Sequence, residues 1–130
     1  MIDGFFTKMS ERVEKTSDEL EYEKVLRAVR RGNSKAKTKL ARFKLSGLGG
    51  AEVDKDGAVA LLKKCVKDKG SDAVWMLGLC YEYGMGCEQD VEEAEKFYKR
   101  SSDGGNAIGD FFAKNGRVVR ESGVMKVESL

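Results

Sequence analysis

Residues 81–90, with the sequence YEYGMGCEQD, distinguish between two kinds of loop. Gly84 and Gly86 stand one residue apart, after a hydrophobic run and before an acidic one. Such glycines occur in loops that hold nucleotide phosphates and in turns between helices. A dinucleotide-binding loop needs a third glycine, but Gln89 stands at that place and no strand pattern precedes the loop. The segment therefore predicts a turn between two helices.

The sequence around this loop repeats at an interval of 36 or 37 residues. On the N-terminal side the pairs lie 37 apart: Ala36 and Ala73, Leu40 and Leu77, Ala41 and Gly78, Gly47 and Gly84, Gly49 and Gly86. On the C-terminal side they lie 36 apart: Asp54 and Asp90, Ala58 and Ala94, Leu61 and Phe97, Leu62 and Tyr98, Cys65 and Ser101. Small residues match small ones and large match large ones. A repeat of this length is typical of stacked helical hairpins.

In the second copy, the spacing of apolar residues predicts a first helix. Ala73, Leu77 and Tyr81 lie four residues apart and so share one helical face. Gly78 lies within this helix, where glycine costs roughly 1 kcal/mol relative to alanine. We expect it to allow close approach of a second helix at Ala94.

The second helix and the turn have their own signals. Small and aromatic residues recur at spacings of three and four, at Ala94, Phe97, Tyr98 and Ser101. Gly84 and Gly86 are expected to end the first helix with positive φ angles, and Asp90 to cap the second.

These positions resemble those of the Sel-one-like repeat, a relative of the tetratricopeptide repeat. The matching residues are Ala73, Leu77, Gly78, Tyr81, Gly84, Met85, Gly86, Asp90, Ala94, Phe97, Tyr98, Lys99 and Gly105. The first copy departs from the pattern at Lys44, in the tyrosine position, and at Gly57, before its alanine. The resemblance implies an all-α superhelix of about three antiparallel helix pairs.

The resemblance also gives the organisation of the chain. The expected segments are an N-terminal segment (1–17), the second helix of a degenerate repeat (18–33), two repeats (34–70 and 71–105), a partial repeat (106–116) and a C-terminal tail (117–130). The segment AVRRGNSKA at 28–36 resembles the junction between repeats. Ile2, Phe5, Phe6, Met9 and Val13 recur at helical spacing and are expected either to cover one open end or to form a frayed tail.

In the tetratricopeptide analogy, the first helix of each pair lines a concave face. The corresponding positions are Lys35, Thr38, Arg42, Leu45 and Ser46 in the first copy, and Asp72, Trp75, Leu79, Glu82 and Tyr83 in the second. Trp75, Leu79 and Tyr83 form a second apolar stripe, which either packs against neighbouring helices or faces a partner. We predict a non-catalytic module that binds a peptide or helix of a partner protein on this face.

Charge patterning leaves an alternative open. Nine basic and no acidic residues lie in 24–51, and six acidic and no basic ones in 82–95, although the net charge is only +2. The basic 24–44 face is either a solvated surface or a site for an acidic partner, a phosphate group or nucleic acid. Nucleic acid is disfavoured because few aromatic residues accompany the basic ones. Self-association through the open ends of the solenoid is also compatible with this pattern.

Signals for catalysis and metal binding are weak. The chain has no histidine, the usual general base and a common metal ligand. Residues 34–37 match the SxxK motif of serine β-lactamases without its partner motifs, so a hydrolase is the least favoured alternative. Cys65, Cys80 and Cys87 lack the CxxC spacing and are expected to be reduced and buried. We predict no cofactor and no metal.

Targeting signals are absent from the sequence. Neither a signal peptide nor an apolar segment of roughly 20 residues is recognisable. A cytoplasmic protein without membrane contact is expected.

Overall fold

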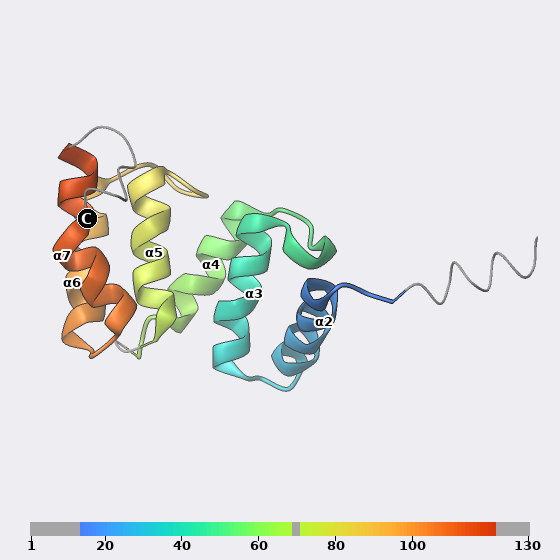
Figure 1. The fold of residues 1–130 in the computed structure, drawn as a ribbon. Coiled ribbons are helices and arrows are strands. Elements are labelled where there is room, and N and C mark those ends of the chain that lie inside the picture. Colours follow the sequence, from blue (N-terminus) through green and yellow to red (C-terminus); the bar gives the residue numbers. More distant parts are fainter. Residues whose placement is uncertain (1–13, 69–70, 122–130) are drawn as a thin grey trace, which may run out of the picture.

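The computed structural model describes residues 14–68 and 71–121, and these residues are helical apart from their connections (Figure 1). The elements are α2 (Ser17–Arg30), α3 (Ser34–Ser46), the short 3₁₀ helix η1 (Leu48–Gly50), α4 (Lys55–Cys65), α5 (Asp72–Tyr83), α6 (Val91–Asp103) and α7 (Ala107–Glu121). No strand occurs in this part of the chain. The predicted all-α solenoid is confirmed.

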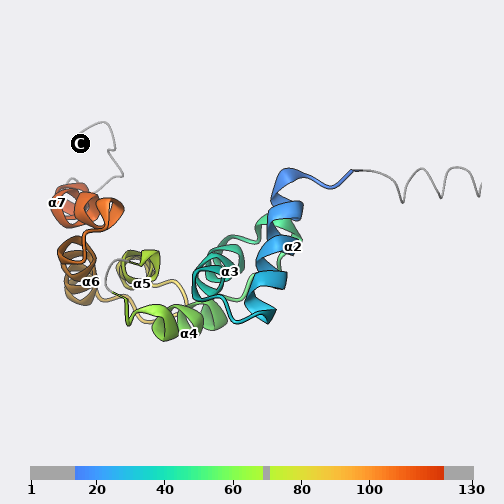
Figure 2. The ribbon, with the colours of Figure 1, turned by 90° about the horizontal axis from the view of Figure 1, so that it is seen from below.

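The helices form an arc, which Figure 2 shows along the direction of the helices. The first helices of the two complete pairs, α3 and α5, lie on the inside of the arc, and the second helices, α4 and α6, lie on the outside. The two ends of the arc are formed by α2 and α7. The concave side is therefore lined by first helices, as in the tetratricopeptide analogy.

The glycine turns and the caps follow the sequence prediction. Gly84 and Gly86 adopt positive φ angles of 67° and 70°, and Gly47 in the first copy has 74°. The carboxylates of Asp90 and Asp54 each accept a hydrogen bond from the backbone N–H three residues further on, at 3.0 and 2.9 Å. These local interactions end the first helix and begin the second in both copies.

Glycine contacts show that α2 occupies the place of a second helix. Gly86 lies so close to α4 that a side chain there would collide with the carbonyl group of Lys55. Gly49 packs in the same way on the carbonyl group of Asp18 in α2. Each contact of the first copy lies 37 residues before its equivalent in the second. The helix α2 thus takes the position of a second helix relative to the loop of the first repeat.

The junctions between repeats show that α7 is a first helix. The N–H of Asn33 donates to the carbonyl of Ala28, and that of Asn106 donates to Ser101, both at 3.1 Å. Each asparagine side chain then caps the helix that follows it. The described residues therefore form two complete helix pairs, with α2 in the position of a second helix before them and α7 in the position of a first helix after them.

The partial repeat was predicted to end at 116, but α7 continues to Glu121. The N-terminal apolar residues Ile2, Phe5, Phe6, Met9 and Val13, and the last part of the predicted C-terminal tail, lie outside the described residues.

The core of the second repeat is built around Gly78. A Cβ atom at this position would lie 2.6 Å from Cε1 of Tyr98 and 3.3 Å from the carbonyl oxygen of Ala94. The sequence predicted a close approach at Ala94, but the ring of Tyr98 is the nearer neighbour. Cys80 is buried here as expected, whereas Cys65 and Cys87 are only half-buried.

Candidate binding groove

The concave face can be followed over three inner helices, because α7 repeats the pattern of α3 and α5. Equivalent positions are Lys35, Thr38 and Arg42 on α3; Asp72, Trp75 and Leu79 on α5; and Ile108, Phe111 and Asn115 on α7. The α7 positions were missing from the sequence prediction. They follow from the same 36-residue interval, which gives Ile108 from Asp72 and Phe111 from Trp75.

Aromatic stacking joins α5 to α7. The Trp75 ring stacks on Phe112 with their centroids 5.7 Å apart, and Phe112 also stacks on Tyr98 at 5.2 Å. Phe111 meets Phe112 edge-on at 5.5 Å. Trp75 is half-buried against the core, so it both packs within the solenoid and contributes to the groove surface.

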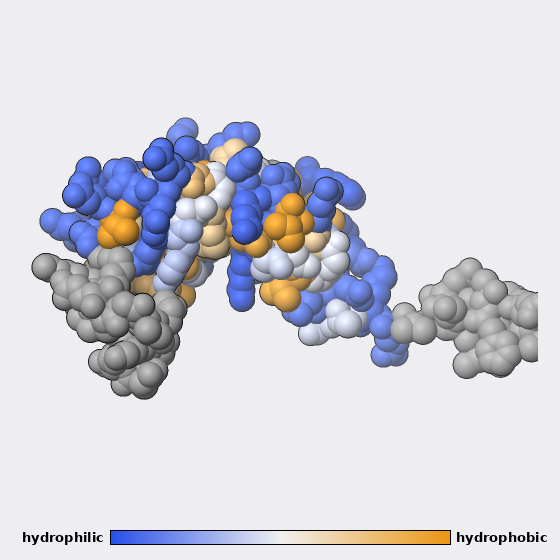
Figure 3. Space-filling model, turned by 90° about the horizontal axis from the view of Figure 1, so that it is seen from above, coloured by the Kyte–Doolittle hydropathy of each residue, from blue (hydrophilic) through white to orange (hydrophobic). Residues whose placement is uncertain are grey.

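Several apolar side chains of this region remain accessible. Ile108 and Phe111 are each 46% exposed, and Tyr83, at the other end of α5, is 49% exposed. Leu79 and Leu45 are half-buried. From above, the surface is mostly hydrophilic with separate apolar patches (Figure 3).

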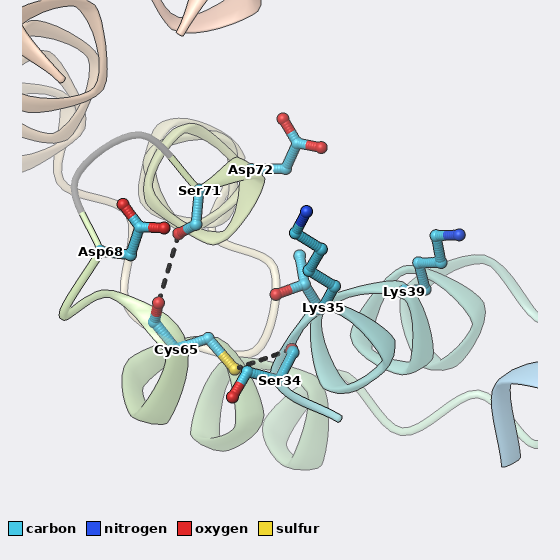
Figure 4. A pocket seen from close by; sticks show the side chains of 8 residues that line it. Ser34, Lys35, Lys39, Cys65, Asp68, Ser71 and Asp72 are labelled. Atoms are coloured by element: carbon cyan, nitrogen blue, oxygen red, sulfur yellow. Dashed lines mark hydrogen bonds between the residues drawn. The ribbon is translucent and has the colours of Figure 1, made fainter. Parts of the chain in front are cut away.

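A cleft of about 460 Å³ lies between the start of α3 and the connection from α4 to α5 (Figure 4). Its lining residues are Ser34, Lys35, Thr38, Lys39, Cys65, Asp68, Ser71 and Asp72. Figure 4 shows that Lys35 and Lys39 come from the α3 wall, whereas Asp68 and Asp72 come from the opposite wall. The structure thus brings the predicted groove residues Lys35, Thr38 and Asp72 together.

The carboxylate of Asp72 is held in place at the edge of this cleft. One oxygen accepts hydrogen bonds from Nε1 of Trp75 at 2.8 Å and from Nδ2 of Asn106 at 2.9 Å. These bonds connect α5 to the cap of α7 and orient the tryptophan ring. Asp72 therefore has a structural task in addition to its place in the groove.

A smaller cleft of about 270 Å³ lies between α2 and α3. It is lined by Asp18, Glu21, Lys39, Arg42, Phe43 and Leu48. Lys39 forms an ion pair with Glu21 at 3.8 Å, and Lys44 forms one with Asp54 at 3.6 Å. The basic block of the sequence is therefore partly opposed by carboxylates once the chain has folded.

Two predicted groove residues are largely buried. Glu82 is only 5% exposed, and its carboxylate accepts a hydrogen bond from the hydroxyl of Tyr98 at 2.5 Å. Its side chain thus points towards α6 and away from the groove. The equivalent residue of the first repeat is Leu45, which packs against the core. Thr38 is 8% exposed and reaches the cleft with little of its surface. Ser46 is exposed, and its hydroxyl donates to the carbonyl of Arg42 within α3.

The groups named for catalysis are not assembled into a site. Ser34 lines the larger cleft, but Lys37 of the SxxK match does not. Burial raises the pKa of the Cys80 thiol to about 11 and also raises the pKa of Cys87, so both thiols stay protonated near neutral pH. Over residues 14–68 and 71–121, no cluster of three or more acidic or cysteine side chains has the arrangement of a metal site.

None of the helices in the described part of the chain combines the length and the apolar character needed to cross a bilayer.

Pairs of antiparallel helices, repeated at 36 or 37 residues and stacked into an arc, define an α-helical repeat solenoid. The family model of the Sel1 repeat matches residues 34–64 and 71–106, which together make up just over half of the chain. The chain belongs to the Sel1 repeat family, and the resemblance found in the sequence is confirmed.

A solved structure agrees with this fold. The crystal structure of a Sel1 repeat protein from Oxalobacter formigenes matches with a TM-score of 0.65 at 20% sequence identity, over 82% of this chain and 43% of that one. At this identity the match supports the fold alone, and the chain spans less than half the length of that protein. No curated protein matches the chain.

Proposed function

We propose that this chain is a non-catalytic interaction module, which binds a peptide or helix of a partner protein on its concave face. Membership of the Sel1 repeat family supports this role, because Sel1 repeats commonly serve as protein-interaction scaffolds. The partner contacts would come from the inner helices α3, α5 and α7.

One observation carries the proposal: the equivalent inner positions of α5 and α7 hold Trp75 and Phe111, and the phenylalanine is 46% exposed. Exposed aromatic residues beside a rigid hydrophobic surface are typical anchors of protein interfaces. The stacked rings of Trp75 and Phe112 hold this surface in place before any partner arrives, which lowers the entropic cost of binding.

The test compares two exposed apolar residues. Phe111→Ser removes an inner-face side chain, whereas Val53→Ser removes a side chain that is 54% exposed and lies in the connection between α3 and α4. With the full chain as bait, a stoichiometric partner should be retained by the Val53→Ser variant and lost by the Phe111→Ser variant. Equal retention by both folded variants would place the binding surface elsewhere.

Trp75→Ala is the stronger but less selective variant. Removing an anchor of this kind costs the complex roughly 2 kcal/mol or more. Because Trp75 also packs on Phe112, its loss should lower the stability of the free protein as well. Circular dichroism of the free variant separates these effects, and Phe111→Ser avoids most of the second.

The alternative function uses the basic 24–44 face for an acidic partner, a phosphate group or nucleic acid. Binding of this kind weakens steeply with salt and should depend on Arg30, Arg31 and Lys35 rather than on Phe111. The ion pair from Lys39 to Glu21 reduces the positive charge of that face. The least favoured alternative, a hydrolase, requires an activity that Ser34→Ala abolishes.

A further inference from the structure

The inner helices differ in the kind of side chain that they expose on the concave side. The α3 wall presents cations, namely Lys35, Lys39 and Arg42, whereas the outward positions of α5 and α7 present Trp75, Leu79, Ile108 and Phe111. The boundary between the two kinds of surface is therefore parallel to the helix axes. A ligand that matches it needs one charged side and one apolar side along its own length.

Two of the cations are available to a ligand. Among residues 14–68 and 71–121, neither Lys35 nor Arg42 takes part in a salt bridge, and both are exposed. Lys39 is already opposite Glu21. Of the carboxylates nearby, Asp72 accepts hydrogen bonds from Trp75 and Asn106. Asp68 faces Lys35 across the larger cleft, and Asp18 lies in the smaller one with Arg42. The helix α3 itself carries no acidic residue, so the side of a ligand that lies along α3 meets Lys35 and Arg42, which favours carboxylates on that side.

The spacing of the cations matches a helix. Lys35 and Arg42 are seven residues apart, which is two helical turns and about 10 Å along α3. A helix lying beside α3 has the same rise, so two acidic residues seven positions apart face both cations. On its neighbouring side the same helix presents apolar residues at spacings of three and four.

The shape of the groove also favours a helix. In Figure 2, α3 and α5 lie side by side on the concave side, and the end helices α7 and α2 rise on either side of them, so the concave side is bordered on three sides. Successive side chains of a helix point in directions 100° apart and can meet all three sides, whereas those of an extended chain alternate between two opposite faces. We propose that the ligand is an amphipathic helix, with its apolar stripe on α5 and α7 and with acidic residues seven apart facing α3. This inference rests on the proposed function and specifies its partner.

The experiment selects binders from a displayed library of random 16-residue peptides on the full chain. The expected peptides carry apolar residues at spacings of three and four, flanked by Asp or Glu. Synthetic copies are then titrated by fluorescence anisotropy. Replacing a central residue of the peptide by proline, which breaks a helix, should weaken binding at least about tenfold.

Charge reversal tests the orientation of the ligand. The double variant Lys35→Glu/Arg42→Glu should bind an acidic peptide about tenfold or more weakly, because like charges then face each other. The same peptide with lysines in place of its acidic residues should recover binding to this variant. The control is Lys63→Glu/Lys64→Glu on the outer helix α4, which changes the net charge equally and should leave the affinity within about twofold.

Failures of the two hypotheses look different. Selected peptides without acidic enrichment, or peptides that tolerate the proline, would overturn the amphipathic-helix inference, while the proposed function stands if Phe111→Ser and Leu79→Ser still weaken binding. Peptides that bind these two variants like the wild type would overturn both. A selection that recovers no peptide would also overturn both.

Discussion

The two complete repeats pack their first helix against their second helix with different residues. In the second repeat Gly78, Glu82 and Tyr98 meet between α5 and α6; the equivalent residues of the first repeat are Ala41, Leu45 and Leu62. The tyrosine ring needs the space that a Cβ atom at Gly78 would fill, and its hydroxyl needs the carboxylate of Glu82. Leu62 is smaller than tyrosine and has no polar group, so the first repeat can have alanine, Ala41, opposite it. Whether this position holds glycine or alanine thus depends on the size of the residue that faces it on the second helix.

The largest expected effect comes from Gly78→Ala. The new methyl group would lie 2.6 Å from the Tyr98 ring, and overpacking of this kind typically costs about 1–3 kcal/mol. We expect a loss at the upper end of that range in urea unfolding, because the ring is fully enclosed.

Two controls sharpen this prediction. The triple variant Gly78→Ala/Glu82→Leu/Tyr98→Leu copies the first repeat and should be more stable than the single variant Gly78→Ala. Ala41→Gly in the first repeat meets no clash and should cost only about 1 kcal/mol from helix propensity. A Gly78→Ala protein as stable as the wild type would show that the ring can move aside.

Next in size is Tyr98→Phe. It removes the hydrogen bond that a buried carboxylate accepts, and such bonds to charged groups contribute about 1.5–3 kcal/mol. Thermal and urea unfolding should both show the loss. Tyr81→Phe is the matched control, since Tyr81 is only half-buried and its ring stacks on Phe97. Equal effects of the two substitutions would contradict a special role for the buried hydroxyl.

The turns and caps of the repeats could be predicted from the sequence, because they depend on residues that are close together in the chain. The positive φ of Gly84 and the cap at Asp90 depend on residues within a few positions of each other, so spacing predicts them. The bond from Tyr98 to Glu82 joins residues 16 apart on different helices. The tetratricopeptide analogy placed Glu82 at the groove, and only the position of α6 shows that its carboxylate points inwards to Tyr98.

The groove was predicted incompletely for a related reason. Its positions on α3 and α5 came from the two clear repeats, and Phe111 was missed because the third copy is partial. The valines at 118 and 119 show no clear helical period with the residues after them, so the sequence predicted the end of the partial repeat at 116, whereas α7 ends at Glu121. The junction around Asn106 fixes the register of α7 through hydrogen bonds that the sequence alone does not display.

A smaller effect, on self-association, is expected from the helix-packing positions at the two ends of the described solenoid. Ala41 with Ala58, and Gly78 with Ala94, provide small residues at the close approach of two helices; at the ends, the equivalent positions are Glu21 and Lys114. Charged side chains there disfavour end-to-end stacking, because stacking would remove them from water.

The variant Glu21→Ala/Lys114→Gly tests whether these charges limit self-association through the open ends. Sedimentation velocity should show tighter self-association than in the wild type, by roughly 1 kcal/mol or about fivefold. Glu23→Ala/Lys96→Gly, which removes one acid and one lysine elsewhere, is the control. An unchanged sedimentation profile would show that the terminal charges do not set the assembly state.

The smallest effect concerns thiol chemistry, where the second repeat has Cys80 in place of Phe43. Its pKa is raised from 9.0 to about 11 by burial, so at pH 8 less than about 1% is thiolate. Alkylation of Cys80 in the native protein should therefore be slow near neutral pH, because the thiol is both protonated and fully buried. In urea, where the protein is unfolded, Cys80 should be labelled as fast as Cys65 and Cys87. Peptide mapping identifies the labelled cysteine. Rapid labelling at pH 8 without unfolding would contradict the tight enclosure of α5.

The stack of Trp75 on Phe112 gives the molecule an internal optical reporter. Trp75 is the single tryptophan of the chain, so its fluorescence originates at one place on the concave side. A ligand covering the indole would displace solvent and shift the emission to shorter wavelength, without any dye being attached. Because Phe112 also touches Tyr98, the same signal would register disturbances that begin between α5 and α6.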